Sequence, residues 1–374
     1  MDLLRLSQAS LAELYEVLPA VFFGLSVLAG LLAPLALALP GVNPQMLASG
    51  PALARRTLLP VILLALIFAR NAPAEHAGVP LGLDLYMPVP ESNPVTPEKV
   101  SLGRRLFLDR RLSRDGSLSC AGCHDPSRGF ADGRTVSEGV FHRRGSRNVP
   151  TLINRGYGSA FFWDGRISTL EEQVLQPILN PVEMDMTVEE VMSRVRRDGQ
   201  YRRRFRQTFG REITKDDLAC ALASFVRTIL SGGSPYDRYV SGDPSALTAE
   251  AREGLRLFRG KGNCIACHVG PNLTDERFHN TGIAWRDGKL ADPGRFAVTG
   301  LDADHGAFKP PTLREVARTA PYMHDGSLAT LEDVVEYYDR GGNRNPYLDV
   351  ELRPLHLTPE EKRAIVTFLK SVNP

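Results

Sequence analysis

The chain has 374 residues, of which 43% are hydrophobic and 24% charged, and its formal net charge is +2. This composition excludes wholesale disorder, a collagen and a pure coiled coil, and the length suggests two or three domains. The near-neutral charge argues against nucleic acid as a partner. Five cysteines are too few for a disulfide scaffold of this size, and their odd number leaves at least one thiol unpaired.

Residues 1–74 are predicted to be a signal peptide or a membrane anchor. Residues 18–39 are almost wholly apolar and long enough to span a bilayer. Residues 58–69 form a shorter apolar run between an arginine pair and small residues, which is typical of a secretory signal. Two interpretations stay open: an anchor through residues 18–39, or translation from Met46 followed by cleavage behind the second run. Both place the rest of the chain outside the cytoplasm, and we expect the periplasm.

Two C-x-x-C-H motifs follow, at residues 120–124 and 264–268. This spacing suits c-type haem, because the two thiols add to the vinyl groups and the adjacent histidine binds the iron. An all-cysteine zinc site is the alternative, but it would leave both histidines without a role. We therefore predict two covalently bound c-type haems. Their anchors are Cys120, Cys123, Cys264 and Cys267, and their proximal ligands are His124 and His268.

The segments around the two motifs resemble each other, which indicates a duplication. Residues 103–107 (GRRLF) and 254–258 (GLRLF) each belong to a predicted helix that leads into a haem motif. Closing helices are predicted to run from Thr214 to about Leu230 and from Thr358 to about Val372, and both begin with a T-x-x-[DE] capping box. The fifth cysteine, Cys220, lies in the first closing helix and is expected to be a small buried hydrophobe.

These patterns predict a mainly α fold with two cytochrome c-like haem domains in tandem behind the N-terminal segment. Strand signals are few and short. A stretch rich in glycine and serine, Ser231–Pro235, marks the boundary. The predicted domains are therefore residues 91–232 and residues 233–374.

Four further motifs accompany the haem sites: RNVPTL at 147–152, FWDGR at 162–166, PVEM at 181–184 and TAPYMHDG at 319–326. Through these motifs, residues 91–374 resemble the bacterial diheme cytochrome c peroxidase family. The resemblance implies that hydrogen peroxide reacts at the N-terminal, peroxidatic haem. It also implies that electrons enter through the C-terminal haem.

The resemblance also assigns three candidate catalytic residues. Glu183 would move the proton that peroxide loses and its departing oxygen regains. Gln173 would orient the bound peroxide, and Trp163 would relay electrons between the haems. Trp285, the other tryptophan, matches no motif and is expected to be a packing residue.

One calcium ion between the domains is implied as well, because family members bind it through an asparagine side chain and two backbone carbonyls. The matching positions here are Asn148, Thr319 and Pro321. Oxygen ligands of this kind suit a hard cation.

The distal ligands would decide which branch of the family this chain resembles. The family's removable distal histidine falls at Val140, which cannot bind iron, so the first haem is expected to be five-coordinate or water-bound unless a loop shift brings His142 in. The second haem's distal methionine falls at Tyr338, as in the tyrosine-ligated MauG branch, with Met323 as the alternative ligand. An anionic oxygen ligand there would stabilise oxidised iron.

The predicted function is therefore a periplasmic peroxidase that reduces hydrogen peroxide with electrons from a small redox protein, such as a cytochrome c or a cupredoxin. One alternative is MauG-like oxidative modification of a partner protein. The other is a diheme electron carrier without catalysis, against which Gln173 and Glu183 argue. A homodimer is also possible on this interpretation.

Overall fold

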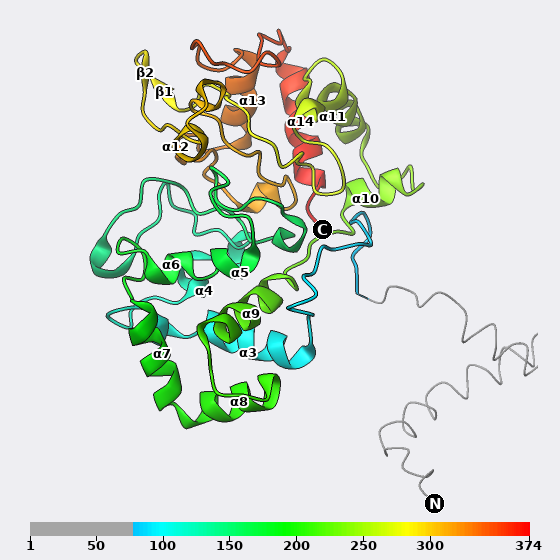
Figure 1. Cartoon of the computed structure of the whole chain (residues 1–374). Helices are drawn as coiled ribbons and strands as arrows, with labels where there is room; N and C mark the ends of the chain where they lie inside the picture. Colours follow the sequence, from blue (N-terminus) through cyan, green and yellow to red (C-terminus); the bar gives the residue numbers. More distant parts are fainter. Residues whose placement is uncertain (1–77) are drawn as a thin grey trace, which may run out of the picture. The chain divides into compact units, whose positions relative to one another are not determined.

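Helices make up almost all of the regular structure in the computed structural model, which describes residues 78–374 (Figure 1). The sheet within this range is one antiparallel pair, β1 (Trp285–Arg286) with β2 (Lys289–Leu290). The predicted mainly α fold is therefore confirmed. No helix in residues 78–374 is both long and apolar enough to cross a membrane. The predicted signal or anchor at 1–74 lies outside the described residues.

The N-terminal half, as the term is used below, runs from α3 to α9. Its haem motif occupies the single turn of α4, and two longer helices, α7 and α8, are inserted before the closing helix. The helices are α3 (Pro97–Phe107), α4 (Cys120–Cys123), α5 (Leu170–Gln173), α6 (Gln176–Leu179), α7 (Val188–Arg197), α8 (Gly199–Phe209) and α9 (Lys215–Val226).

The C-terminal half runs from α10 to α14 and repeats the same plan with a 3-10 turn, η6 (Cys264–Ala266), at its haem motif. Residues 78–374 together form one compact unit. The helices of this half are α10 (Pro235–Val240), α11 (Ala249–Arg259), α12 (Phe296–Thr299), α13 (Leu331–Asp339) and α14 (Pro359–Ser371).

The duplication is visible in two equivalent helix crossings, α3 on α9 and α11 on α14. A Cβ atom added to Gly103 would lie 1.9 Å from the carbonyl oxygen of Ala221, and one added to Gly254 would lie 1.9 Å from that of Ala364. Glycine is therefore required at both crossings, because any side chain would push the helix backbones apart.

An aromatic pair lies one helical turn beyond each crossing glycine. The rings of Phe107 and Phe225 are 5.1 Å apart, and those of Phe258 and Phe368 are 5.0 Å apart. Each pair belongs to its own hydrophobic core, one built from α3 and α9 and the other from α11 and α14. In the repeated G-x-x-x-F pattern, the glycine therefore allows the two helices to approach closely, and the phenylalanine supplies one ring of the aromatic pair in each core.

The helix caps follow the sequence closely, with one difference at the end of α9. Thr214 and Thr358 both close capping boxes, as predicted. However, α9 ends at Val226 rather than near Leu230. The buried guanidinium of Arg227 pairs with Glu171 at 2.6 Å, and the chain then leaves the helix to pair with the backbone and side chain of Asn154. These tertiary contacts outweigh the local helical preference.

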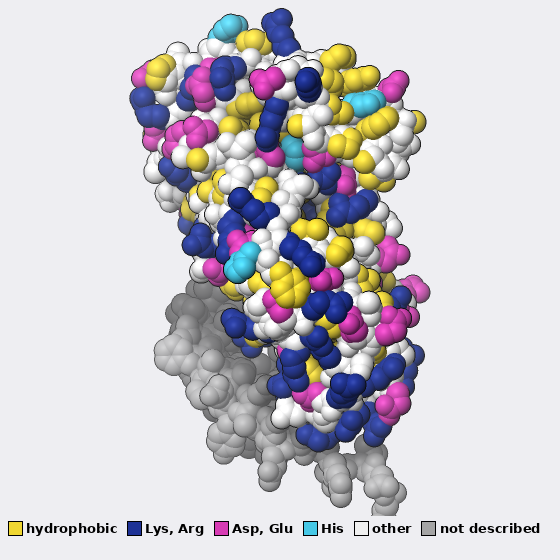
Figure 2. All heavy atoms as spheres, turned by 90° about the vertical axis from the view of Figure 1, so that its left-hand side faces the viewer, with side chains coloured by type: hydrophobic (Ala, Val, Ile, Leu, Met, Phe, Trp, Pro, Cys, Tyr) yellow, Lys and Arg dark blue, Asp and Glu magenta, His cyan; other side chains and the backbone are white. Residues whose placement is uncertain are grey.

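The α7–α8 hairpin is strongly basic. Residues 188–211 contain eight arginines and three acidic residues, although the whole chain carries a formal charge of only +2. Basic side chains gather toward the end of the molecule that carries these helices (Figure 2). Asp198 joins the two helices, since its side chain accepts hydrogen bonds from the first backbone N–H groups of α8.

The crossing glycines give the first testable prediction. Replacing Gly103 or Gly254 with alanine should destabilise the protein by about 1–3 kcal/mol or more, because the new methyl group meets a backbone carbonyl that cannot turn aside. Thermal unfolding of the haem-loaded protein measures this. Gly199→Ala is the control, since its methyl group would meet only two arginine side chains, at 3.7 and 3.8 Å. Equal melting temperatures for all three variants would contradict the prediction.

Candidate functional site

His124 is held by the loop that follows α4. Its backbone N–H donates to Cys120 at 2.9 Å, and its Nδ1 lies 3.0 Å from the carbonyl oxygen of Phe130. Burial lowers the pKa of His124 to about 4, so the ring is neutral. An Nδ1–H that donates to a carbonyl leaves Nε2 as the free ring nitrogen, which is the arrangement that a metal-binding histidine needs.

His268 repeats this arrangement in the C-terminal half. Its Nδ1 lies 2.9 Å from the carbonyl oxygen of Leu273, and burial lowers its pKa. Both acceptor residues have positive φ, 59° at Phe130 and 52° at Leu273, so the two loops bend back toward the imidazole in the same way. The two loops therefore offer equivalent iron-binding nitrogens.

The thiols beside the two histidines form no disulfides, and three of them lie in poorly solvated places. Burial raises the pKa of Cys120 to about 12, that of Cys123 to about 11 and that of Cys264 to about 12. Thioether bonds to a haem carry no charge and therefore suit sulfur atoms in such poorly solvated places. Cys220 is half-buried in α9 rather than fully buried as expected, and it is also unpaired.

A cavity of about 560 Å³ lies next to His124, a volume within the range of cofactor sites. It collects nearly all the residues predicted for the first site from five separate chain segments. Its walls include Cys120, Cys123, His124, Asn148, Trp163, Gln173 and Glu183. The C-terminal half also contributes to these walls, through Lys309, Pro311 and Thr312.

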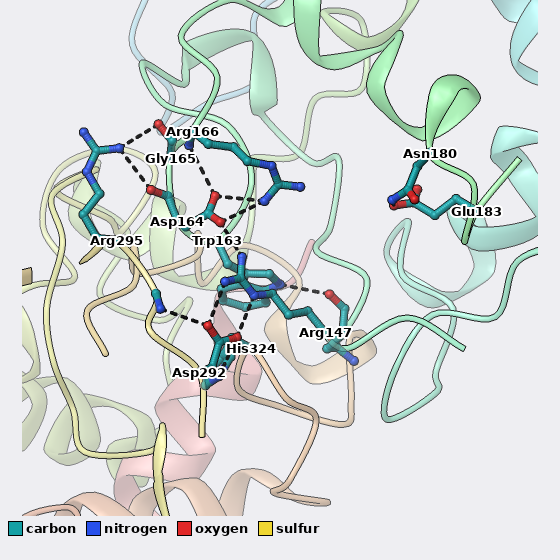
Figure 3. Close-up of polar contacts among 12 residues, drawn as sticks. Arg147, Trp163, Asp164, Gly165, Arg166, Asn180, Glu183, Asp292, Arg295 and His324 are labelled. Carbon is teal, nitrogen blue, oxygen red and sulfur yellow. Dashed lines mark hydrogen bonds and ion pairs between the residues drawn. The ribbon is translucent and has the colours of Figure 1, made fainter. Parts of the chain in front are cut away.

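Glu183 is positioned by its own turn. Its Oε1 accepts a hydrogen bond of 2.7 Å from Asn180 Nδ2, and the two side chains point toward each other in Figure 3. Burial raises the pKa of Glu183, and only the Asn180 bond and the charge of Arg166 oppose that effect. A carboxyl group with a raised pKa can exchange protons nearer to neutral pH than an exposed one. Gln173 enters the same cavity as the last residue of α5.

The two positions considered for a distal histidine, Val140 and His142, lie outside the walls of this cavity. Val140 is completely buried, and its N–H donates to the carbonyl oxygen of Glu183 at 2.8 Å. Gly139 packs so closely on this turn that a Cβ would lie 1.9 Å from the Val182 carbonyl oxygen. The side chain of His142 is 92% exposed and binds Glu138 at 2.8 Å, outside the cavity walls. Neither Val140 nor His142 therefore places a ring nitrogen in the walls of the cavity next to His124.

Hydrogen bonds to both halves of the molecule hold Trp163 in place. Its indole Nε1 donates to the carbonyl oxygen of Asn148 at 2.9 Å, and its own carbonyl oxygen accepts from the backbone N–H of Lys309 at 2.9 Å. Asn148 in turn donates its N–H to the carbonyl oxygen of His324 at 2.7 Å. Trp163 therefore lies where the backbone of the C-terminal half meets the wall of the first cavity.

A network of charged groups surrounds Trp163, and sequence analysis missed it (Figure 3). Arg147 binds Asp164 at 2.6 Å and makes two bonds of 2.8 Å to Asp292, 145 residues away in the C-terminal half. Arg295 of the C-terminal half donates to the carbonyl oxygens of Asp164 and Gly165. Arg147 and Asp164 lie in motifs that were recognised, but nothing in the sequence marked Asp292 as their partner.

Tyr338 lies on α13, within electrostatic reach of the cysteines of the second haem motif. Burial raises its pKa, and Tyr337, Cys267 and Cys264 raise it further, so these groups are close neighbours. Its hydroxyl has no hydrogen-bond partner within residues 78–374, whereas the hydroxyl of Tyr337 donates to the carbonyl oxygen of Thr281 at 2.9 Å. A smaller cavity of about 280 Å³ touches His268 but not Tyr338. Met323, the alternative ligand, is half-buried at positive φ.

The predicted calcium ligands stay a prediction. No three His, Cys, Asp or Glu side chains of residues 78–374 converge as a metal site, but the expected site needs only one amide and two carbonyls. Asn148 is buried, its Nδ2 donates to the Arg134 carbonyl oxygen at 2.7 Å, and its Oδ1 accepts no bond from the described residues. An amide oxygen of this kind is the type of ligand that a hard cation prefers.

Comparisons with known proteins agree with this geometry. A sequence model of the di-haem cytochrome c peroxidase family matches residues 97–245. Methylamine utilization protein MauG of Methylorubrum extorquens is 43% identical over 288 residues, which cover 76% of this chain and 81% of that protein. The chain belongs to the di-haem cytochrome c peroxidase family.

Two further similarities cover even more of the proteins compared. Cytochrome c551 peroxidase of Nitrosomonas europaea is 38% identical over 321 residues, which are 85% of this chain and 92% of that one. The crystal structure of a MauG-like protein associated with microbial copper homeostasis matches with a TM-score of 0.73 at 36% identity. That match covers 78% of this chain and 94% of the other. Membership of the family implies two c-type haems, and the paired histidine loops fit them.

The inter-half ion pairs give a second testable prediction. Asp292→Asn should destabilise the protein by about 1.5–3 kcal/mol, because the half-buried Arg147 loses a charged, two-bonded partner. Denaturant unfolding of the haem-loaded protein at neutral pH measures the change. Asp302→Asn is the matched control, since the Asp302 side chain is 86% exposed. If both variants unfold at the same denaturant concentration, the inter-half pairs do not stabilise the fold.

Proposed function

We propose that this protein is a peroxidase of the periplasm that reduces hydrogen peroxide to water at the His124 haem, with electrons from a small redox protein. The observation that carries the proposal is the position of Glu183. Its carboxyl group, with a raised pKa, shares one cavity with Gln173 and with the imidazole of His124. An electron carrier has no need of such an acid-base group over an open site.

The haem supplies the iron at which the peroxide bond is cleaved and the path by which electrons reach it. Glu183 accepts the proton that peroxide releases on binding and returns a proton to the departing oxygen. Asn180 holds the carboxylate in place through its 2.7 Å bond. Gln173 offers both a donor and an acceptor for orienting the peroxide. The exposed His142, bound to Glu138, leaves the distal space open to peroxide.

Trp163 is the proposed relay between the two haem sites. Its indole N–H donates to a backbone carbonyl, which cannot accept the proton outright, so the side chain can lose and regain an electron without losing that proton. Its backbone is bonded to Lys309 of the C-terminal half, which fixes the ring in the wall between the two sites. A calcium ion at Asn148, Thr319 and Pro321 would hold the same junction together.

A second candidate is MauG-like oxidation of a side chain in a partner protein. The observation that favours it is Tyr338, which lies within electrostatic reach of Cys264 and Cys267 and whose hydroxyl has no hydrogen-bond partner among residues 78–374. A phenolate ligand stabilises oxidised iron and lowers the reduction potential of the second haem. Such a site would draw electrons from a protein side chain instead of accepting them from an ordinary redox carrier.

The role of Glu183 gives a third testable prediction. Glu183→Gln should lower kcat/KM for peroxide by about 10²–10⁴-fold, because glutamine cannot move the proton. In the wild type, activity should fall as the pH drops through a pKa above 4.5, since burial raises the pKa of the base and protonation removes it. Steady-state assays with reduced cytochrome c across pH measure both effects. The exposed Glu189→Gln is the control, and undiminished turnover in Glu183→Gln would remove the proton-transfer role.

Tyr338 gives a fourth prediction, and its neighbour provides a matched control. Tyr338→Phe should change the low-spin haem spectrum of the oxidised protein and raise that haem's potential, because an anionic ligand to Fe(III) is lost. Tyr337→Phe removes the bond to Thr281 but should leave the low-spin spectrum unchanged. Electron paramagnetic resonance and visible spectra distinguish the two. An unaltered low-spin signal in Tyr338→Phe would point to another ligand, and the MauG-like candidate would lose its support.

A further inference from the structure

Lys309 is an unusual side chain in the wall of the first cavity, because it is a lysine that is only 7% exposed. It comes from the C-terminal half, whereas Cys120, His124 and Glu183 come from the N-terminal half. Its Nζ makes one hydrogen bond within residues 78–374, to Glu276 Oε1 at 3.2 Å. An ammonium group has three donors, so two of them are left without a partner in a nearly dry place.

Glu276 cannot neutralise Lys309 by itself. The same carboxylate receives two bonds from Arg155, at 2.7 and 3.2 Å, and a third from the backbone N–H of Ser159 at 3.1 Å. Two cations therefore share one anion. Desolvation and the charge of Arg155 lower the pKa of Lys309 to about 8, because Glu276 and the charge of Asp275 oppose these effects only in part.

Besides Lys309 and Arg155, the cavity wall holds the largely buried cation Arg147, which is already neutralised. Arg147 lies between two carboxylates, Asp164 and Asp292. Arg166 binds Asp164 as well, and Arg144 is exposed to solvent. Among the buried cations of the wall, the shortfall of paired negative charge therefore lies at Lys309 and Arg155, which share Glu276. A buried charge is stable only when it is paired, so the cavity is built for an anionic group at this point.

A c-type haem carries such groups, because the edge opposite its two thioether bonds ends in two propionates. We propose that the Lys309 ammonium binds a propionate of the first haem and thereby raises that haem's reduction potential. The proposal rests on the haem at His124 in the proposed function. A nearby positive charge favours the reduced iron, which carries one positive charge less. The backbone N–H of Lys309 also donates to the carbonyl oxygen of Trp163. Lys309 would therefore connect the haem to Trp163, the proposed electron relay.

Spectroelectrochemical titration of the two-haem protein tests the proposal. Lys309→Met keeps most of the volume and removes the charge, so the potential of the high-spin His124 haem should fall while that of the low-spin His268 haem changes less. The propionate-bending band in the resonance Raman spectrum should shift as well. Lys309→Arg should retain a potential near that of the wild type. Lys215→Met, at an exposed position on α9, should leave both potentials unchanged.

An unchanged high-spin potential in Lys309→Met, with both haems bound, would overturn the proposal. If Lys309→Met cannot be purified with two haems, the same titration of Glu276→Gln tests the proposal instead. Removing the shared carboxylate should raise the high-spin potential, and no change in that variant would equally overturn the proposal. The titration needs neither peroxide nor an electron-donor protein. A protein without peroxidase activity would therefore still give a clear result, and failure of the proposed function would be seen separately.

Discussion

The hydrogen bond from each proximal imidazole to a backbone carbonyl is the constraint on which the rest of the structure depends. His124 donates to Phe130 and His268 to Leu273, and in each case the acceptor residue has positive φ. Because Nδ1–H is committed to the loop, Nε2 is the nitrogen left for iron and the ring plane is set. The loop, in turn, is carried by a helix pair whose crossing tolerates only glycine at Gly103 or Gly254. Covalent anchoring, ring orientation and helix packing therefore form one repeated unit.

The contact between the two halves depends on charge rather than on a continuous apolar core. Arg147 joins Asp164 to Asp292, and Glu276 joins Arg155 to Lys309, so both clusters cross from one half to the other. Ion pairs in a poorly solvated place stabilise little in themselves, but breaking one leaves a charge without a partner. They therefore specify the relative position of the halves strictly. Trp163 contacts this boundary through its backbone and through the carbonyl of Asn148, which suits a relay whose position must be reproducible.

Two predictions from the sequence needed correction, and for the end of α9 the physical reason is a contact distant in the sequence. Helix α9 ends at Val226, because the guanidinium of Arg227 forms an ion pair with Glu171. Cys220 is half-buried rather than fully buried. The sequence also left His142 open as a ligand of the first haem. The structure turns that imidazole to solvent, because Val140 fills the core and Gly139 packs against the turn that carries Glu183.

The sequence by itself determined the haem attachment motifs, the duplicated helices with their threonine caps, and the candidates Glu183, Gln173 and Trp163. These features are local or repeated: a C-x-x-C-H motif and a capping box each act within a few residues, and the duplicated helices are visible as a repeat. Only the tertiary structure decided that Asp292 pairs with Arg147, that burial raises the pKa of Glu183, and that Lys309 enters the first cavity. Desolvation and charge pairing depend on neighbours more than a hundred residues away. No local pattern in the chain can encode which of its many charged groups will meet.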